Sequence, residues 1–220
     1  LDFAKSLKKK KIVEMLEAAV AKGGKTASKG DKGAKAKPAK VPSASTSWDH
    51  LESCLQKSHP KVFQTLARPA TARQVSELIV AVKIRITKEV QEFFHRHNGQ
   101  TGGPELIELD GEQYGFRLLS TEQAAREWSV WKELNDGGDF ADAEAAADDT
   151  VRETWWHDKW LPMAGNGAGD FLCFDFSPAH GGKQGQIITL WHERPNREVA
   201  FESVRHVLAE LAAVWEAKLP

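Results

Sequence analysis

The sequence is 220 residues long, 41% of them hydrophobic, with a formal net charge of −1. This apolar content allows a sizeable buried core and excludes wholesale disorder. No apolar run approaches the roughly 20 residues that a membrane helix needs, and no signal-peptide pattern opens the chain, so we expect a cytoplasmic protein. Cys54 and Cys173 match no metal-binding or redox spacing.

The charge is divided unevenly along the chain. Residues 1–40 carry twelve lysines and four acidic residues, a net charge of +8, and the remaining 18 basic and 27 acidic residues give −9. Such asymmetry indicates a basic tail joined to an acidic domain.

The basic part divides into two segments. Residues 1–21 place apolar side chains at roughly helical spacing and resemble the end of an ankyrin repeat, which predicts a helical fragment and an ankyrin array upstream. Residues 22–47 consist largely of Lys, Gly, Ala, Ser and Pro, which predicts a flexible linker. Its lysines either contact nucleic acid or an acidic partner, or they only keep a spacer segment solvated. The segment has no aromatic residue to stack on bases, which favours the spacer.

The domain is predicted to occupy residues 48–220 and to begin with helices. Each predicted helix follows a side chain suited to capping, and its apolar residues recur at helical spacing. The predicted caps are Ser47, Thr71, Thr87 and Ser120, and a last helix covers residues 203–217.

Short β-type segments separated by Gly, Pro and Asn follow the third helix and dominate the second half of the domain. They cover residues 105–110, 114–119, 160–164, 170–176, 185–192 and 198–203. Helices followed by strands and a final helix predict an α+β fold, with a mostly antiparallel sheet flanked by helices.

Residues 135–150 are rich in Gly, Ala and Asp, and predict a mobile acidic loop or a weakly held helix. The loop is either simply solvated or an electrostatic mimic of nucleic acid that faces the basic cleft of a nuclease. On the second interpretation the carboxylates that bind a partner are Asp136, Asp139, Asp142, Asp148 and Asp149.

Two neighbouring tryptophans follow this segment. Trp155 and Trp156 cannot both point inward if the backbone is extended, so we expect one of them to be exposed. Exposed tryptophan is enriched at protein interfaces, which makes both residues candidates for partner binding.

Residues 155–203 resemble the signature of the SUKH superfamily, which includes the Smi/Knr-type regulators of fungal cell-wall assembly. The matching positions are Trp160, Leu161, Pro162, Gly165 to Asp170 with Gly169 among them, Asp175, Pro178, Gly182, Gly185, Gln186 and His192. The resemblance implies an α+β fold with one mostly antiparallel sheet, no cofactor and a protein-binding role. Bacterial members are commonly immunity proteins that block nuclease or deaminase toxins, whereas fungal members are signalling scaffolds.

No catalytic, cofactor or metal site is expected from the remaining motifs. The glycines of residues 165–170 precede a β-type run, which favours a hairpin turn over a phosphate-binding loop. Asp170 and Asp175 lie five residues apart on one strand, so their side chains point to opposite faces and cannot form a close carboxylate pair. Both are expected to cap turns. Asp170 follows a glycine turn that we expect to expose it. It is therefore a further candidate for partner binding, besides the carboxylates of the acidic loop and the two tryptophans. His95 and His97 lack the spacing of a helical metal pair.

Three functional hypotheses follow. The first is an immunity-type inhibitor that neutralises a nuclease or deaminase toxin by direct binding. The second is an intracellular scaffold that combines ankyrin repeats with a Smi/Knr-like domain, and an enzyme ranks last. The charge of the domain argues against direct nucleic-acid binding, and the sequence indicates no oligomeric state.

Overall fold

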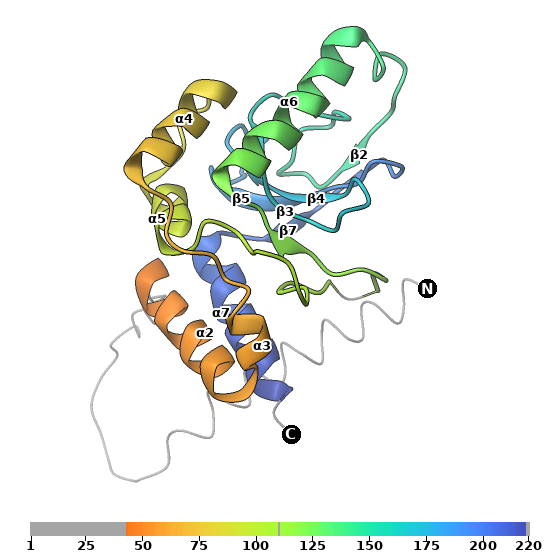
Figure 1. Ribbon diagram of the computed structural model, residues 1–220. Coiled ribbons are helices and arrows are strands. Elements are labelled where there is room, and N and C mark those ends of the chain that lie inside the picture. The colour runs from red at the N-terminus through yellow and green to blue at the C-terminus, as the bar shows by residue number, and fades with distance from the viewer. Residues whose placement is uncertain (1–42, 110, 219–220) are drawn as a thin grey trace, which may run out of the picture. The chain divides into compact units, whose positions relative to one another are not determined.

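The computed structural model describes residues 43–109 and 111–218 (Figure 1). The helical fragment predicted over residues 1–21, with its ankyrin-like pattern, lies outside the described residues, as does nearly all of the predicted linker. The described part has the predicted α+β fold, with helices surrounding a mostly antiparallel sheet. The division of the whole chain into three regions stays a prediction.

Three predicted helix caps are confirmed. The hydroxyls of Thr71, Thr87 and Ser120 each accept a hydrogen bond from a main-chain N–H three residues on, which satisfies a donor that the first turn leaves free. The helices are α2 (Ala44–Ser58), α3 (Pro60–Phe63), α4 (Ala72–Val82), α5 (Lys88–Arg96), α6 (Thr121–Gly137) and α7 (Val204–Ala217).

The cap predicted for the first of these helices is wrong. Helix α2 starts at Ala44, and Ser43 is its cap: the Ser43 hydroxyl accepts a hydrogen bond from the Thr46 N–H at 3.2 Å. Ser47 is buried inside the helix, and its N–H donates to the Ser43 carbonyl at 3.0 Å. Several hydroxyl side chains in a row all suit a cap, and the earlier start is favoured because it also buries Ala44.

The central sheet has five strands in the order β1-β3-β4-β5-β7, all antiparallel. Four of them match predicted segments of the second half of the domain. The strands are β1 (Arg117–Leu118), β3 (Trp160–Gly165), β4 (Phe171–Asp175), β5 (Gln186–Leu190) and β7 (Val199–Phe201). A separate parallel pair, β2 (Ala146–Ala147) with β6 (Asn196–Arg197), is not predicted from the sequence.

The two β-type segments predicted over residues 105–110 and 114–119 are mostly not strands. They meet in one isolated bridge, between Ile107 and Phe116, and only β1 joins the sheet. Leu106 and Ile107 are consecutive and both fully buried, so the segment does not alternate between two faces. The Leu106 carbonyl accepts a hydrogen bond from the Trp215 indole at 3.0 Å, which ties this loop to α7.

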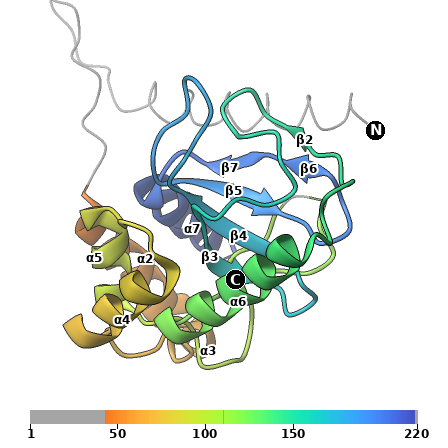
Figure 2. The same ribbon diagram turned by 90° about the horizontal axis from the view of Figure 1, so that it is seen from above.

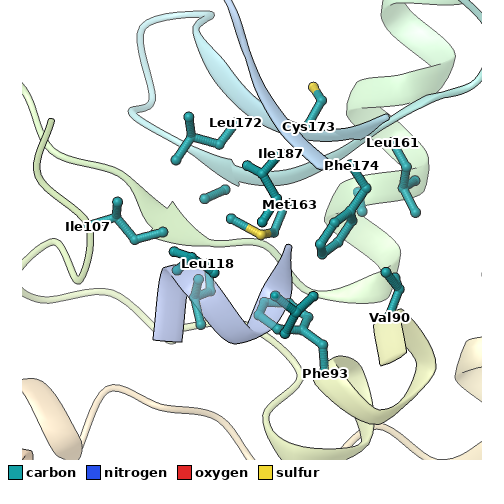
Figure 3. Packing of buried hydrophobic residues seen from close by; sticks show 14 of the residues in the cluster. Val90, Phe93, Ile107, Leu118, Leu161, Met163, Leu172, Cys173, Phe174 and Ile187 are labelled. Carbon is teal, nitrogen blue, oxygen red and sulfur yellow. The ribbon is translucent and has the colours of Figure 1, made fainter. Parts of the chain in front are cut away.

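The main core lies between the sheet and the helices α5 and α7. Figure 3 shows Phe174 of β4, Met163 of β3 and Phe93 of α5 pointing into this space. The Phe93 and Phe174 rings lie edge to face with centroids 5.5 Å apart, a favoured aromatic geometry. Cys173 points to the other side of β4, so both faces of the sheet are covered.

The helices α6 and α7 cover opposite faces of the sheet. In Figures 1 and 2, α7 lies below β5 and β7, and α6 runs above β3 beside α4. The chain that leaves α6 runs on to β2, as Figure 2 shows. Among the described helices, none is long and apolar enough to cross a membrane.

Candidate protein-binding surface

The acidic segment, residues 133–158, begins in the last turn of α6. That helix ends at Gly137, and its cap Gly138 has a φ of 86°, the left-handed conformation that glycine adopts without strain. The chain then turns over residues 138–142 and pairs β2 with β6, so of the weakly held helix considered for residues 135–150 only residues 135–137, the end of α6, are helical. Every acidic side chain of the segment is exposed: Glu133, Asp136, Asp139, Asp142, Glu144, Asp148, Asp149, Glu153 and Asp158.

Some of these carboxylates have a partner in the fold. Asp136 pairs with Lys132 at 2.6 Å, Asp158 pairs with Lys159 at 3.1 Å, and Asp148 accepts the Val199 N–H at 2.8 Å. Within residues 43–109 and 111–218, the other carboxylates of the segment form no salt bridge: Glu133, Asp139, Asp142, Glu144, Asp149 and Glu153. With respect to the part of the chain that the structure describes, the segment therefore presents a field of unpaired negative charge.

An aromatic layer lies beneath the acidic segment. Ring centroids are 5.4 Å apart for Trp131 and Phe140, 6.3 Å for Phe140 and Trp155, and 6.0 Å for Trp128 and Trp156. The expectation of one exposed tryptophan is wrong, because Trp156 is only 4% exposed and Trp155 is half-buried. The backbone at these residues is not a strand, so both rings can turn toward the layer.

A buried arginine anchors the aromatic layer to the sheet. Arg197 of β6 is fully buried and donates two hydrogen bonds to the Trp155 carbonyl, at 3.0 and 2.8 Å. It also donates to the Arg194 and Asn196 carbonyls, and its guanidinium carbon lies 4.9 Å from the centroid of the Trp155 ring. Burial lowers the Arg197 pKa to about 10, so the side chain stays charged at neutral pH. Sequence reasoning missed this residue because nothing local marks a lone arginine between short strands.

Two cavities open on this surface. The aromatic cavity, of about 500 Å³, is lined by Phe140, Trp155, Trp156, Glu144 and Glu153, with alanines between them. The polar cavity, of about 650 Å³, is lined by Asp148, Asp149, Arg152, Glu153 and His157. Phe140 was also missed from the sequence, although it is the one aromatic residue between Trp131 and Trp155.

His157 forms part of the wall of the polar cavity. Its Nδ1 accepts a hydrogen bond from the Lys159 N–H at 3.1 Å, and burial lowers its pKa. The imidazole is therefore neutral at physiological pH, and it adds no positive charge to the acidic surface.

Asp170 lies in a different part of the fold from the other candidate residues. Its carboxylate accepts hydrogen bonds from the His192 N–H at 3.0 Å, from the His192 ring at 2.8 Å and from the Asn166 amide at 2.8 Å. Burial alone raises the pKa of this carboxyl, but these hydrogen bonds outweigh burial and lower it. Asp170 is largely buried rather than exposed by its glycine turn, and it lines a separate cavity of about 280 Å³ with Tyr114 and Arg194.

Several positions of the family signature form one buried network at the β4–β5 connection. Asp175 is fully buried and accepts hydrogen bonds from the Ser177 N–H at 2.8 Å and the Gln186 amide at 3.1 Å. Burial raises the Asp175 pKa, and these hydrogen bonds only partly offset the rise. Gln186 also donates to the Thr150 carbonyl at 3.0 Å, which ties the network to the acidic segment.

The glycines and the proline of the signature shape the same connection. A Cβ on Gly182 would lie 2.5 Å from the Thr150 carbonyl oxygen and 2.6 Å from Pro178, so only glycine fits there. Gly185 has a φ of 87° and donates its N–H to the Asp175 carbonyl at 2.7 Å. These positions hold the turn in place and present no side chain for a ligand.

The remaining signature positions lie on β3 and its hairpin. Trp160 and Pro162 are opposite Asp175 and Cys173 in the register of β3 and β4. Gly169 has a φ of 102°, and a Cβ there would lie 3.2 Å from the His192 ring, so it makes room for the Asp170–His192 contact. The glycine turn is the predicted hairpin between β3 and β4.

The cysteine and histidine side chains that could serve as a nucleophile or as metal ligands are buried or hydrogen-bonded within the fold. Burial raises the pKa of the Cys173 thiol well above its ordinary value. The Nδ1 atoms of His95 and His97 lie 2.8 Å from the carbonyls of Ala70 and Ala67. Over residues 43–109 and 111–218, no three His, Cys, Asp or Glu side chains are grouped so that they could hold a metal ion.

The sequence is similar to fungal regulatory proteins. It is 26% identical to the KNR4/SMI1 homolog of Yarrowia lipolytica, over 78% of this chain and 30% of the relative. It is 22% identical to the Saccharomyces cerevisiae cell wall assembly regulator SMI1, over 77% of this chain and 40% of the relative. The glucan synthesis regulatory protein of Neurospora crassa is 21% identical, over 76% of this chain and 37% of the relative.

The chain thus spans between 30% and 40% of the length of these three relatives. Residues 69–210, which include every described strand and the helices from α4 to α6, match the SMI1 / KNR4 family, also called SUKH-1. This match covers more than half of the sequence, and the chain therefore belongs to the SMI1 / KNR4 family.

Proposed function

We propose that this chain is the protein-binding domain of a regulator of cell wall or glucan assembly. Relatives of this chain are named for cell wall assembly regulation and for glucan synthesis regulation. The observation that carries a binding role is the field of unpaired carboxylates of the acidic segment, set around a cavity with aromatic walls. On this proposal, an ankyrin array that ends with residues 1–21 supplies a second docking module.

A binding role is supported by the way in which the reactive groups are used. The carboxylates of Asp170 and Asp175 accept hydrogen bonds that stabilise turns, and the Cys173 thiol is buried in the sheet. A cysteine nucleophile needs a low pKa and access to solvent. Burial raises the pKa of Cys173 and closes it off from solvent. Regulation on this proposal proceeds by recruiting a partner.

The charge of the surface selects the class of partner. Unpaired carboxylates attract a basic protein surface and accelerate its association, whereas they repel the phosphates of nucleic acids. The aromatic rings supply the apolar contact area that concentrates binding energy at protein interfaces. The partner is therefore a protein with a basic docking segment.

Affinity capture with the full 220-residue chain tests the proposal. The bait is compared with a variant in which Asp139, Asp142 and Asp149 become asparagine, because these three exposed side chains form no salt bridge in the described part of the chain. A control variant removes the same charge elsewhere through Glu77→Gln, Glu122→Gln and Glu193→Gln. We expect proteins of signalling or cell wall synthesis on the original bait and the control, and at least about 5-fold less on the first variant.

Two results would contradict the proposal. Retention of a secreted nuclease or deaminase would favour the toxin-neutralising role that the sequence suggested first. Equal retention by all three baits would show that the acidic segment is not the docking surface.

A further inference from the structure

The aromatic cavity has walls of two chemical kinds. Phe140, Trp155 and Trp156 supply aromatic surface, and Glu144 and Glu153 supply carboxylates. Its volume of about 500 Å³ lies within the range of ~300–1,000 Å³ that is typical of small-ligand pockets. A cavity of this size accepts one or two side chains of a docked segment.

The electrostatics of the cavity favour a cation. None of its described lining residues is basic, and neither Glu144 nor Glu153 forms a salt bridge with any residue of the ranges 43–109 and 111–218. Aromatic faces attract cations through the ring quadrupole, so both kinds of wall select the same charge.

Trp156 contributes ring surface, and not a hydrogen-bond donor, to the wall. The residue is only 4% exposed, and its indole Nε1 is closed off from solvent. A docked group therefore meets the edge of the ring and the two carboxylates.

The choice between arginine and lysine follows from shape. A guanidinium is flat, stacks on aromatic rings and pairs with a carboxylate through two parallel hydrogen bonds, whereas an ammonium is a compact, strongly hydrated charge. The fold itself places guanidinium groups on tryptophans, with Arg194 3.8 Å above Trp191 and Arg197 4.9 Å from Trp155.

We infer that the aromatic cavity is the receptor for an arginine side chain of the basic partner segment. This inference rests on the proposed function and names the chemistry of its docking site. The arginine lies against the Phe140 and Trp155 rings, which already pack on each other with centroids 6.3 Å apart, and its guanidinium pairs with Glu144 or Glu153. The surrounding unpaired carboxylates steer the segment toward the cavity.

The test uses the full chain and a synthetic peptide, Gly-Ser-Arg repeated three times with blocked ends. Two matched peptides carry lysine or citrulline in place of arginine, since citrulline keeps the shape and removes the charge. Calorimetry gives the affinity, and the indole N–H signals of the tryptophans in an NMR spectrum locate the contact. We expect arginine to bind about 3-fold or more tightly than lysine, and about 10-fold or more tightly than citrulline.

Variants separate the cavity from the general charge of the domain. Phe140→Leu keeps an apolar side chain but removes the ring, and Glu144→Gln with Glu153→Gln removes the carboxylates. We expect each to weaken binding by at least about 5-fold, whereas Glu77→Gln with Glu122→Gln, which removes the same charge elsewhere, changes it by less than about 2-fold. Thermal unfolding of each variant shows that it remains folded.

The inference is overturned if the lysine peptide binds as tightly as the arginine peptide, or if the cavity variants bind like the original chain. It is also overturned if the distant charge-matched control weakens binding equally, because the field alone would then account for the affinity. The capture experiment changes Asp139, Asp142 and Asp149, which do not line this cavity. A captured partner that depends on these residues therefore leaves the proposed function standing even where the peptide test fails.

Discussion

At the scale of single residues, the candidate surface depends on a cation that has no anionic partner among residues 43–109 and 111–218. Arg197 is fully buried, and its hydrogen bonds run to main-chain carbonyls of Trp155, Arg194 and Asn196. Burying a charge is costly unless its donors are satisfied, and here the carbonyls and the Trp155 ring replace the lost water. The acidic segment is thereby fixed to β6 next to the sheet.

Replacing Arg197 with methionine tests this anchor. Methionine fills a similar apolar volume but leaves several carbonyls without a donor, so we expect a loss of about 2 kcal/mol in the free energy of unfolding. Urea unfolding measures it, with Arg73→Met as the control at an exposed side chain, where we expect a change within about 0.5 kcal/mol. Equal unfolding midpoints for the two variants would show that Arg197 does not stabilise the attachment of the acidic segment to β6.

At the scale of elements, sequence patterns predicted the parts that follow from local chemistry. Helices α4, α5 and α6 begin at the predicted caps, because a hydroxyl side chain followed by apolar residues at helical spacing marks the start of a helix. The pair β2 and β6 was missed because each strand has two residues, too few for alternation to be visible. Residues 105–110 were misassigned because two consecutive buried side chains resemble a strand in composition alone.

The contact between two connections of the sheet gives a pH-dependent prediction. Asp170 joins the β3–β4 hairpin to the chain after β5 through His192. Its pKa in the folded chain is lowered from 3.8, so its stabilisation is present above that pH and is lost as the pH falls through the folded value. We expect Asp170→Asn to cost about 1–2 kcal/mol at pH 7, because a carboxylate accepts these hydrogen bonds more strongly than an amide.

This cost should shrink as the pH is lowered below 3.8, since the original carboxyl is then protonated as well. Urea unfolding of both proteins at pH 7 and at several acidic pH values measures the difference. A difference that stays constant across this range would mean that Asp170 acts by its shape and not by its charge.

At the scale of the whole molecule, the candidate site was predictable where its residues are neighbours in sequence. The carboxylates and Trp155 and Trp156 gather on one surface because they lie on one continuous segment. Asp170 was assigned to the same set, yet it lies on the hairpin at another cavity, since nothing local reveals where a strand end meets the rest of the fold. The contribution of Arg197 depends on its contact with Trp155, 42 residues away, and that of Phe140 on the turn that folds the acidic segment back on itself, and no sequence spacing encodes either.

On the proposed function, the acidic segment is the surface on which a protein partner docks. Hydrogen exchange of the full chain, alone and saturated with the captured partner, tests it most directly. We expect slower exchange of main-chain amides in residues 139–157 upon binding, and unchanged exchange in residues 166–170 and 191–194 around Asp170. Protection confined to the Asp170 region, with the acidic segment exchanging as in the free chain, would contradict it.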